Sequence, residues 1–304
     1  AGNVTIAAGA YFQNSNILHV GGNWNNNGTF TGVGVNVIFD GAGTQTISAT
    51  TFNNLEINKP VGSVAVLTGD VILNGNLAGT SGTLDIKSFF FNRLVVGGTA
   101  TLANAGTLII DADNAPNKFA SYSLSSNSTV IFNGTATQHL LLPGVVYGNL
   151  IFRNTGNKIL YTPITVNSSL TIESGATFDG GTNTITLNGN WINNGIFTPS
   201  ASTLLCAGSA KTITGVTTFN RFTVTGSYTL LNNITFNNLL NITSTGSLSG
   251  GSTIQTILNG DLINSGVLYS LGTTTFTGNV LQTLSLINAV NTVALTVNFN
   301  GTVS

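Results

Sequence analysis

The stretch GNWNNNGTF, from Gly22 to Phe30, decides the fold because recognisable copies of it return along the chain. It recurs as GNWINNGIF at Gly189–Phe197 and as GDLINSGVL at Gly260–Leu268, and a degraded copy covers Thr101–Leu108. The glycines that anchor the four copies are Gly28, Gly106, Gly195 and Gly266. A recurring interval of tens of residues is typical of stacked repeat architectures.

A second marker has a similar period. The triplet that begins at Gln45 returns in related form at Gln138, Lys211 and Gln282. The longest interval of each marker contains the segment from Asp111 to Ser126, and leaving this segment out brings both close to the others. We therefore predict about four supermodules, with a loop insertion at about residues 111–126.

A shorter repeat lies inside each supermodule. Two pairs of similar segments lie roughly one solenoid coil apart. The first pair is Phe219, Phe222 and Val224 with Phe236, Leu239 and Asn241, and the second is Gly246 and Leu248 with Gly266 and Leu268. Alternating segments such as Thr184–Leu187, rich in β-branched residues and bounded by Asn-Gly or Gly-Gly, predict short strands separated by turns. No helical period is present, and the usual helix formers are scarce.

These nested periods predict an all-β chain that folds as one continuous parallel β-solenoid (β-helix) over residues 1–304. We expect about 16 coils of about 19 residues, because units this short bury an apolar face only by stacking on one another. The alternative is a string of tandem β-sandwich domains, which the hairpin-like Asn-Gly pairs would permit. Similarity at such short intervals is not expected from the strands of such domains.

The composition excludes several classes of function. Only 6% of the residues are charged, against about 25% in a typical soluble domain. Eight Lys and Arg against nine Asp and Glu leave no basic surface for nucleic acid. No apolar run approaches the roughly 18 residues of a membrane span. One Cys excludes a disulfide framework, and the low charge with abundant Thr, Asn and Ser points outside the cell.

The order of the motifs resembles a known style of repeat protein. GNWxNNGxF is followed by Thr-Val-x-Phe-x-Gly segments such as Thr129–Gly134, by the Gln-Thr-Ile triplet and by FNNLEI at Phe52–Ile57. This combination resembles the long repetitive surface proteins of Bacteroidetes-type bacteria, among them gliding adhesins and other large proteins exported by the type IX route. The resemblance implies an extracellular adhesin stalk or filament at the cell surface.

The expected partners follow from the same pattern. The chain opens at Val4–Ile6 and closes at Val297–Ser304 in strand pattern, without charge or Pro in either segment. Uncapped coils of this kind pair with further coils, so we expect further repeats of the same chain or identical subunits stacked end to end. A surface polysaccharide or another cell-surface ligand is the other expected partner.

The alternative function is a carbohydrate-binding or polysaccharide-degrading β-helix protein. Such enzymes need clustered carboxylates, or carboxylates with basic residues and calcium. The acidic residues are mostly scattered, and only Asp111 and Asp113 form a pair by spacing. These two are a candidate binding loop or calcium loop, although Lys118 opposes a cation and a solvated loop also explains them. We predict no enzyme activity, no metal site and no cofactor.

A candidate contact patch consists of Phe89, Phe90, Phe91 and Arg93. Three consecutive phenylalanines cannot all point inward in a strand of period two, so at least one is expected on the surface unless a turn intervenes.

The remaining reactive or aromatic residues are assigned by aligning the supermodules. His19 and His139 take outward strand positions with no catalytic partner nearby in sequence. Cys206 aligns with core phenylalanines, and Trp24 and Trp191 align with leucines, so all three are expected in the core.

Overall fold

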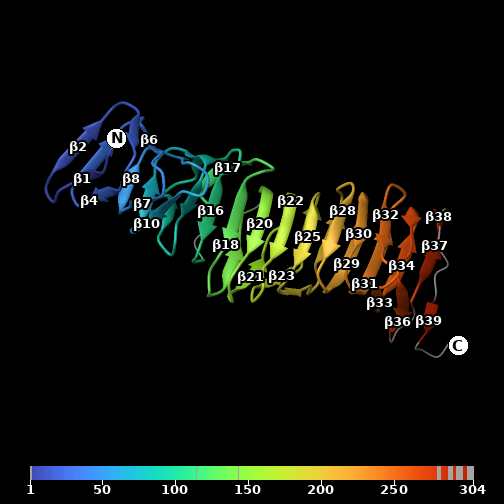
Figure 1. The fold of residues 1–304 in the computed structure, drawn as a ribbon. Helices are drawn as coiled ribbons and strands as arrows, with labels where there is room; N and C mark the ends of the chain where they lie inside the picture. The colour runs from blue at the N-terminus through green and yellow to red at the C-terminus, as the bar shows by residue number, and fades with distance from the viewer. Residues whose placement is uncertain are drawn as a thin grey trace. The chain divides into compact units, whose positions relative to one another are not determined.

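The computed structural model describes residues 2–113, 115–142, 144–278, 282–286, 290–291 and 297–299. All regular secondary structure in these ranges consists of β-strands. The strands pair in parallel with the equivalent strand one coil later. The chain is therefore a parallel β-solenoid, of about 14 turns, as the nested periods predicted (Figure 1).

The coils are on average longer than the sequence suggested, and their length varies. Val4 pairs with Trp24, whereas a longer coil separates Thr83 from its partner Thr107. A short coil lies near Thr217, which pairs with Ile234. The turns vary in length while the strands stay in register, which explains why about 14 turns replace the expected 16.

The chain divides into two compact units, Ala1–Gly156 and Asn157–Ser304. The strands of the first unit are β1 (Val4–Ile6), β2 (Tyr11–Asn14), β3 (Leu18–Val20), β4 (Trp24–Asn26), β5 (Thr29–Gly32), β6 (Asn36–Phe39), β7 (Thr44–Ile47), β8 (Thr50–Phe52), β9 (Asn54–Asn58), β10 (Val64–Leu67), β11 (Val71–Leu73), β12 (Leu77–Ser81), β13 (Thr83–Asp85), β14 (Phe91–Arg93), β15 (Gly97–Leu102), β16 (Thr107–Ile110), β17 (Phe119–Leu124), β18 (Thr129–Phe132), β19 (Gln138–Leu140) and β20 (Val146–Phe152).

The strands of the second unit are β21 (Asn157–Leu160), β22 (Ile164–Ile172), β23 (Thr177–Asp179), β24 (Thr184–Leu187), β25 (Asn190–Asn193), β26 (Ile196–Thr198), β27 (Thr203–Cys206), β28 (Lys211–Thr214), β29 (Thr217–Val224), β30 (Ser227–Leu230), β31 (Ile234–Ile242), β32 (Ser247–Gly250), β33 (Gln255–Leu258), β34 (Asp261–Asn264), β35 (Val267–Leu268), β36 (Thr273–Phe276), β37 (Leu284–Leu286), β38 (Val290–Asn291) and β39 (Val297–Phe299).

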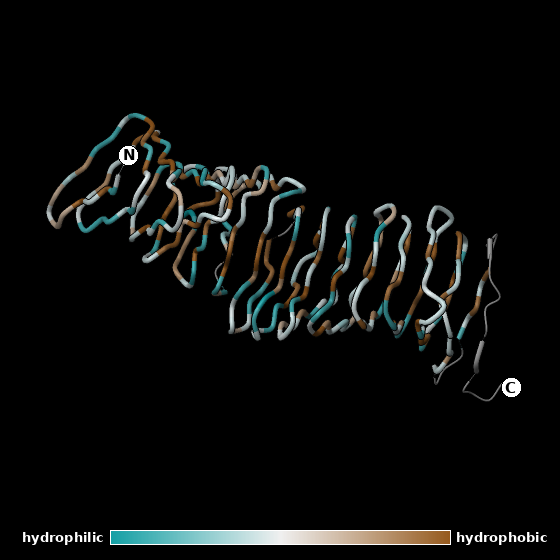
Figure 2. Tube along the Cα trace, in the orientation of Figure 1, coloured by the Kyte–Doolittle hydropathy of each residue, from teal (hydrophilic) through white to brown (hydrophobic). Residues whose placement is uncertain are grey.

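Apolar side chains stack from coil to coil inside each unit. Ile185, Leu204, Phe222 and Leu240 occupy matching positions in four successive coils, and each is at most 1% exposed. Their sequence neighbours point outward, because successive side chains of a strand alternate between its two faces. Figure 2 shows this alternation as brown and pale or teal segments along the strands. Each unit thus has the continuous core that the apolar pattern predicted.

A β-bulge corrects one part of the predicted repeat. Phe219 pairs with Phe236, as expected, but Phe222 pairs with Leu240 rather than with Leu239. The register shifts by one residue between Phe219 and Arg221, because β31 carries an extra residue there. Without this shift, Leu239 would face the core in place of the fully buried Leu240.

The tryptophans of the GNW motif lie in the core, which confirms the prediction for both. Trp24 and Trp191 have no exposed surface. Phe30 packs against Trp24 edge to face at 4.8 Å, and the pair Trp191–Phe197 repeats the same distance and geometry. Each indole N–H donates to a threonine hydroxyl of the next coil, at 2.8 Å for Trp24 and 3.3 Å for Trp191.

The asparagine and glycine of the motif shape the turn that follows. The Asn26 side chain accepts a hydrogen bond from the Gly28 N–H at 3.1 Å, and Asn193 and Gly195 repeat this contact at 3.2 Å. A Cβ atom at Gly28 would lie 2.4 Å from the carbonyl oxygen of Ala7, so a larger residue would collide with the preceding coil. The motif therefore recurs because it fixes one corner of the solenoid.

The glutamine of the second marker ties a different corner of the solenoid to the coil before it. The Gln138 amide donates to the carbonyl oxygens of Ile110 and Ala112, at 3.0 and 2.9 Å, and accepts from the Gly134 N–H at 2.8 Å. Gln45 and Gln282 make the equivalent three contacts with the carbonyl oxygens of Val20 and Gly22, and of Leu258 and Gly260, and with the N–H groups of Gly41 and Gly278. One side chain thus satisfies three main-chain groups.

Lys211 stands where the other corners have glutamine, and a tyrosine from the next coil replaces the missing amide. The Tyr228 hydroxyl lies 2.6 Å from the Leu187 carbonyl oxygen and 3.1 Å from that of Gly189, and it accepts from the Gly208 N–H at 3.2 Å. These three groups are the counterparts of those that glutamine satisfies elsewhere. The chemistry of the corner is therefore retained although its residue type changes.

The predicted loop insertion is partly wrong. Residues Phe119–Leu124, inside the expected loop, form β17 and pair in parallel with β15. The segment FASYSL carries aromatic residues that favour a strand, and Phe119 is buried against Tyr122, with their ring centroids 6.2 Å apart. Among the described residues of the expected loop, the longest part without strand structure lies between β16 and β17.

The corner at Tyr228 gives a direct test of this account. Replacing Tyr228 by phenylalanine removes the hydroxyl that binds the Gly189 carbonyl oxygen and the Gly208 N–H, whereas the Leu187 carbonyl oxygen keeps its bond from the Ala207 N–H. We therefore expect the free energy of unfolding to fall by about 1–3 kcal/mol. Adding Lys211→Gln should recover part of the loss, because it restores the residue found at the other corners. Urea unfolding of both variants provides the measurement.

Tyr269→Phe is the matched control for that experiment, because Tyr269 is 44% exposed in the same unit. Its unfolding should match that of the unmodified chain. Equal stabilities for Tyr228→Phe and Tyr269→Phe would contradict the assigned role of Tyr228.

Candidate functional site

A groove on the surface of the first unit brings together residues from three successive coils. Its volume is about 270 Å³. The residues that line it are Phe90, Asn92, Asp113, Ala115, Asn117, Lys118, His139 and Leu141. The groove therefore contains Phe90 of the predicted contact patch and Asp113 of the predicted binding loop, which were predicted as two separate features.

The groove lies where one sheet is interrupted. Strands β8, β11 and β14 pair in that order, and β14 is the last strand of this sheet. In the next coil, the described residues between Ile110 and Phe119 contain no strand, and β19 follows one coil later. Side chains, rather than a strand, therefore connect the coils at this point.

Asp113 and His139 form one of these connections. The Asp113 carboxylate accepts from the His139 main-chain N–H at 2.7 Å, and its other oxygen lies 2.5 Å from the imidazole Nδ1. Both side chains are partly exposed, at 41% for Asp113 and 31% for His139. Sequence reasoning found no partner for His139, because Asp113 lies a full coil earlier and only the stacking of coils brings the two together.

The second histidine has an equivalent arrangement outside the groove. His19 Nδ1 lies 2.7 Å from the Asp40 carboxylate, which comes from the next coil. The His19 side chain is 57% exposed, so its predicted outward position is confirmed.

Asn92 forms the other connection, and it was not identified from the sequence. Its side chain accepts from the N–H groups of Arg93 and Lys118, at 3.0 and 3.1 Å, and donates to the Asn117 side-chain oxygen at 3.0 Å. Asn92 is only 6% exposed. It therefore acts as a fixed support that holds Asn117 at the surface of the groove.

The predicted contact patch is formed only in part. Phe90 is 38% exposed and Phe89 is half-buried, which confirms that at least one of the three phenylalanines reaches the surface. Phe91 and Arg93 are buried, so they are wrong as surface contacts. The two lie at positions i and i+2 of β14 and therefore share its inner face.

The buried Arg93 guanidinium has a structural role. It donates to the carbonyl oxygen of Gly75 in the preceding coil and to that of Val95, the latter at 3.3 Å. These contacts hold the turn after β14.

Asp111 and Asp113 do not act as a pair. Asp111 accepts from the Asn133 side chain at 2.6 Å and lies 3.7 Å from the Lys87 ammonium group, which is 2.7 Å from Asp85. The hydrogen bond to Asp85 raises the pKa of Lys87. Within the described ranges, no group of three or more His, Cys, Asp or Glu side chains is placed to hold a metal ion.

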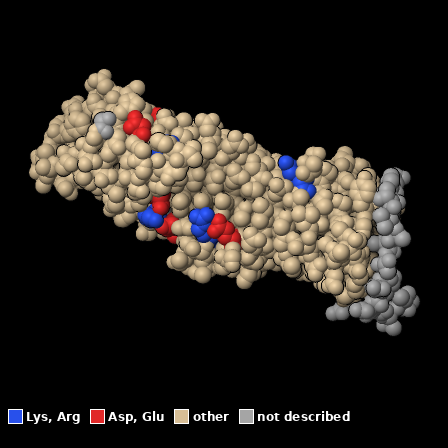
Figure 3. Space-filling view, viewed as in Figure 1, with Lys and Arg blue, Asp and Glu red and all other residues tan. Residues whose placement is uncertain are grey.

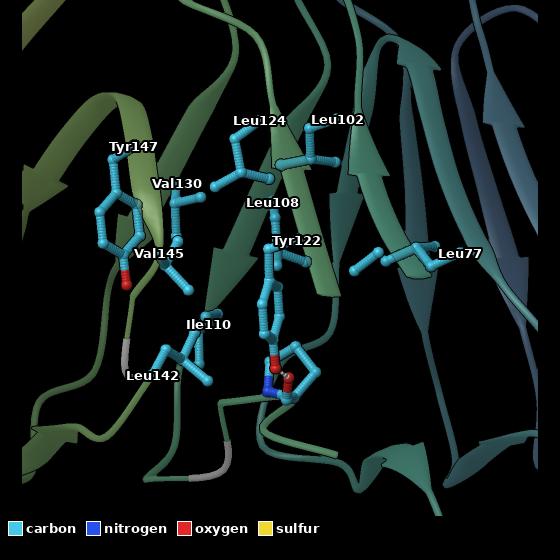
Figure 4. Close-up of a pocket in the computed structure, with 12 residues that line it drawn as sticks. Leu77, Leu102, Leu108, Ile110, Tyr122, Leu124, Val130, Leu142, Val145 and Tyr147 are labelled. Carbon is cyan, nitrogen blue, oxygen red and sulfur yellow. Dashed lines mark hydrogen bonds between the residues drawn. The ribbon is translucent and has the colours of Figure 1, made fainter. Parts of the chain in front are cut away.

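The interior of the first unit contains a small apolar cavity (Figure 4). Its volume of about 20 Å³ would hold about one water molecule. Tyr122 and Tyr147 line it, and the Tyr122 hydroxyl donates to the Pro116 carbonyl oxygen at 2.7 Å. Burial raises the pKa of Tyr122 to about 12. The cavity is too small for an organic ligand, so the surface groove is the candidate site.

Two buried lysines are unusual for a chain with so few charges. Burial lowers the pKa of both Lys59 and Lys158 to about 8. The Lys59 ammonium group donates to the Gly41 carbonyl oxygen at 2.6 Å and to the Gln45 side chain, so it belongs to one of the glutamine corners. Lys59 therefore has a structural role.

The face shown in Figure 3 is largely free of charged side chains, which appear as a few small groups of both signs. No strong field of one sign is present on that face. In the part of the chain that the structure describes, no helix has the length and hydropathy to cross a membrane.

No protein-family model, curated protein or solved structure matches the chain.

Cys206 lies in the core of the second unit, as predicted, and its burial can be tested. The residue has no exposed surface and pairs with Leu187 and Val224 in β24 and β29. Burial raises the pKa of its thiol, which further reduces the reactive thiolate. We expect no reaction with a thiol reagent in the native protein and complete reaction in urea, measured as absorbance of the released chromophore.

A Thr198→Cys variant is the positive control, because Thr198 is exposed in the same unit. One thiol per chain should then react quickly under native conditions. Rapid labelling of the unmodified protein would show that β27 is placed incorrectly.

Proposed function

We propose that the chain is a structural repeat segment of an extracellular protein and forms part of an adhesive stalk or filament at the cell surface. The observation that carries this proposal is the way in which successive coils are joined. Parallel main-chain ladders run from coil to coil, and buried side chains such as Gln138 and Tyr228 bind main-chain groups of earlier coils. Connections of this kind suit a structural protein that extends from a surface and transmits force from repeat to repeat.

The surface chemistry supports the same proposal. Charged residues make up 6% of the chain, and the net charge is −1, so the surface relies on neutral polar groups for its contact with water. Asparagine side chains also link the outside of neighbouring coils: Asn23 accepts from the Thr46 N–H at 2.9 Å, and Asn190 accepts from the Thr212 N–H at 3.0 Å. A neutral, regularly bonded exterior is compatible with the resemblance to repetitive surface adhesins.

Association between copies of the chain is part of this proposal. A parallel ladder can be extended by any coil of matching geometry, including one from an identical chain. A structural filament could therefore be built from more repeats or from more subunits without a new type of contact.

Polysaccharide degradation has less support. Asp111 and Asp113, the one pair of carboxylates that the sequence offered, are bound to different partners, Asn133 and His139. A glycoside hydrolase would need two carboxylates on either side of one glycosidic bond. Polysaccharide binding without cleavage is favoured by the groove.

The proposed location can be tested on cells that make the protein. An antibody against the chain should label intact cells, and protease added to intact cells should remove the signal. A cytoplasmic enzyme that resists the same protease provides the control for cell integrity. Labelling that appears only after lysis would contradict the proposal.

A further inference from the structure

The groove at Phe90 is not explained by a purely structural role. A continuous strand between β14 and β19 would extend the sheet and fill this space. The chain instead places Asp113, Asn117 and Lys118 there, and Asp113 together with Asn92 of the preceding coil makes the connections that a strand would make.

We infer that this groove is a binding subsite for one neutral sugar residue of a polysaccharide. The inference deepens the adhesive role proposed above and rests on it for its biological setting.

The size of the groove matches a single ring. Sites for drug-sized ligands measure about 300–1,000 Å³. The groove, at about 270 Å³, lies just below this range. It is therefore suited to one sugar unit whose neighbours in the polymer extend over the open surface.

The lining combines apolar and polar surfaces, as a sugar ring does. Phe90 and Leu141 offer apolar surface and are 38% and 44% exposed. A pyranose has C–H groups that pack on an aromatic or aliphatic side chain, and its hydroxyl groups both donate and accept hydrogen bonds. The groove thus offers contact for both kinds of surface on one ring.

The polar side chains keep bonding capacity for those hydroxyl groups. The Asn117 oxygen is bound to Asn92, so the Asn117 amide N–H groups are the part left to donate. A carboxylate has about four acceptor positions, and two of those of Asp113 are used by His139. Lys118 donates to the Leu94 carbonyl oxygen at 3.0 Å, one of the three bonds that an ammonium group can make.

The charge of the lining selects a neutral ligand. Asp113 contributes a negative charge and Lys118 a positive one. The two opposite charges offset each other, so neither an acidic nor a cationic ligand gains a net attraction that would repay its loss of hydration. A neutral sugar loses less hydration and needs no such attraction.

A peptide strand is less suitable, because two main-chain N–H groups beside the groove are already bonded to side chains. Peptides that add a strand bind through unpaired main-chain groups. Here the His139 N–H is taken by Asp113 and the Lys118 N–H by Asn92. The same bonds fix the polar groups before a ligand arrives, which lowers the entropic cost of binding.

The test uses the full chain and immobilised polysaccharides of two kinds. The neutral probes are a glucan, a mannan, a galactan and a xylan, and the acidic probes are alginate and polygalacturonate. We expect the protein to bind at least one neutral polymer and to bind the acidic polymers more weakly. Phe90→Ala and Asn117→Ala should each weaken the binding by about tenfold or more.

Matched controls come from the same unit. Tyr11→Ala removes an aromatic side chain that is 61% exposed, and Asn27→Ala removes an exposed asparagine side chain, both outside the groove. Neither should change the binding, and circular dichroism and thermal unfolding should show that all four variants are folded.

Three outcomes would overturn the inference. They are no binding to any neutral polymer, stronger binding to the acidic polymers, and binding that the two groove variants leave unchanged. None of these depends on where the protein resides, so they are separate from the test of the proposed location. An antibody that fails to label intact cells would contradict the stalk and leave the measured sugar binding standing.

Discussion

The structure depends on satisfying main-chain groups where the parallel ladder turns a corner. A strand bonds to its neighbours on both sides, but at each of these corners one carbonyl group and one N–H group need a side-chain partner, because an unpaired buried group costs about 1–3 kcal/mol. Gln45, Gln138 and Gln282 solve this with one amide each, and Tyr228 solves it from the next coil. The coils can differ in length because the turns vary while the paired strands stay in register.

Much of the fold was predictable because the corners leave a trace in the sequence. The GNW and Gln-Thr-Ile motifs predicted the parallel solenoid, and the alignment of the repeats predicted that the tryptophans and Cys206 are buried. The bulge after Phe219 was not predictable, since one extra residue in β31 leaves the apolar pattern almost unchanged. The coil number was overestimated because the repeats that are clearest in the sequence, at Phe219 and at Gly246, lie in coils shorter than the average. Strand β17 was missed because the segment before it, between β16 and β17, does not follow the repeat pattern, so the whole region was interpreted as an insertion.

The candidate site was predictable only in fragments. Phe90 and Asp113 were identified for separate reasons, as an aromatic run and as a carboxylate pair, and the structure places both in one groove. Asn92 and His139 could not be connected to them, because partners in a solenoid lie one coil apart and the coil length varies. Spacing in the sequence therefore does not specify which polar side chains meet. Arg93 was misassigned because the inward position that it shares with Phe91 is unusual for a charged residue.

The central claim is that successive repeats stack as neighbouring coils. Thr186 and Ile263 are distant in sequence, and the register places them on the same column four coils apart, through Leu205, Thr223 and Asn241. Spin labels on cysteines at these two positions, with the buried Cys206 replaced by alanine, allow their separation to be measured by pulsed electron resonance. Four steps of about 4.8 Å predict a backbone separation of about 19 Å. A separation above about 30 Å, the size of one sandwich domain of this length, would contradict the solenoid.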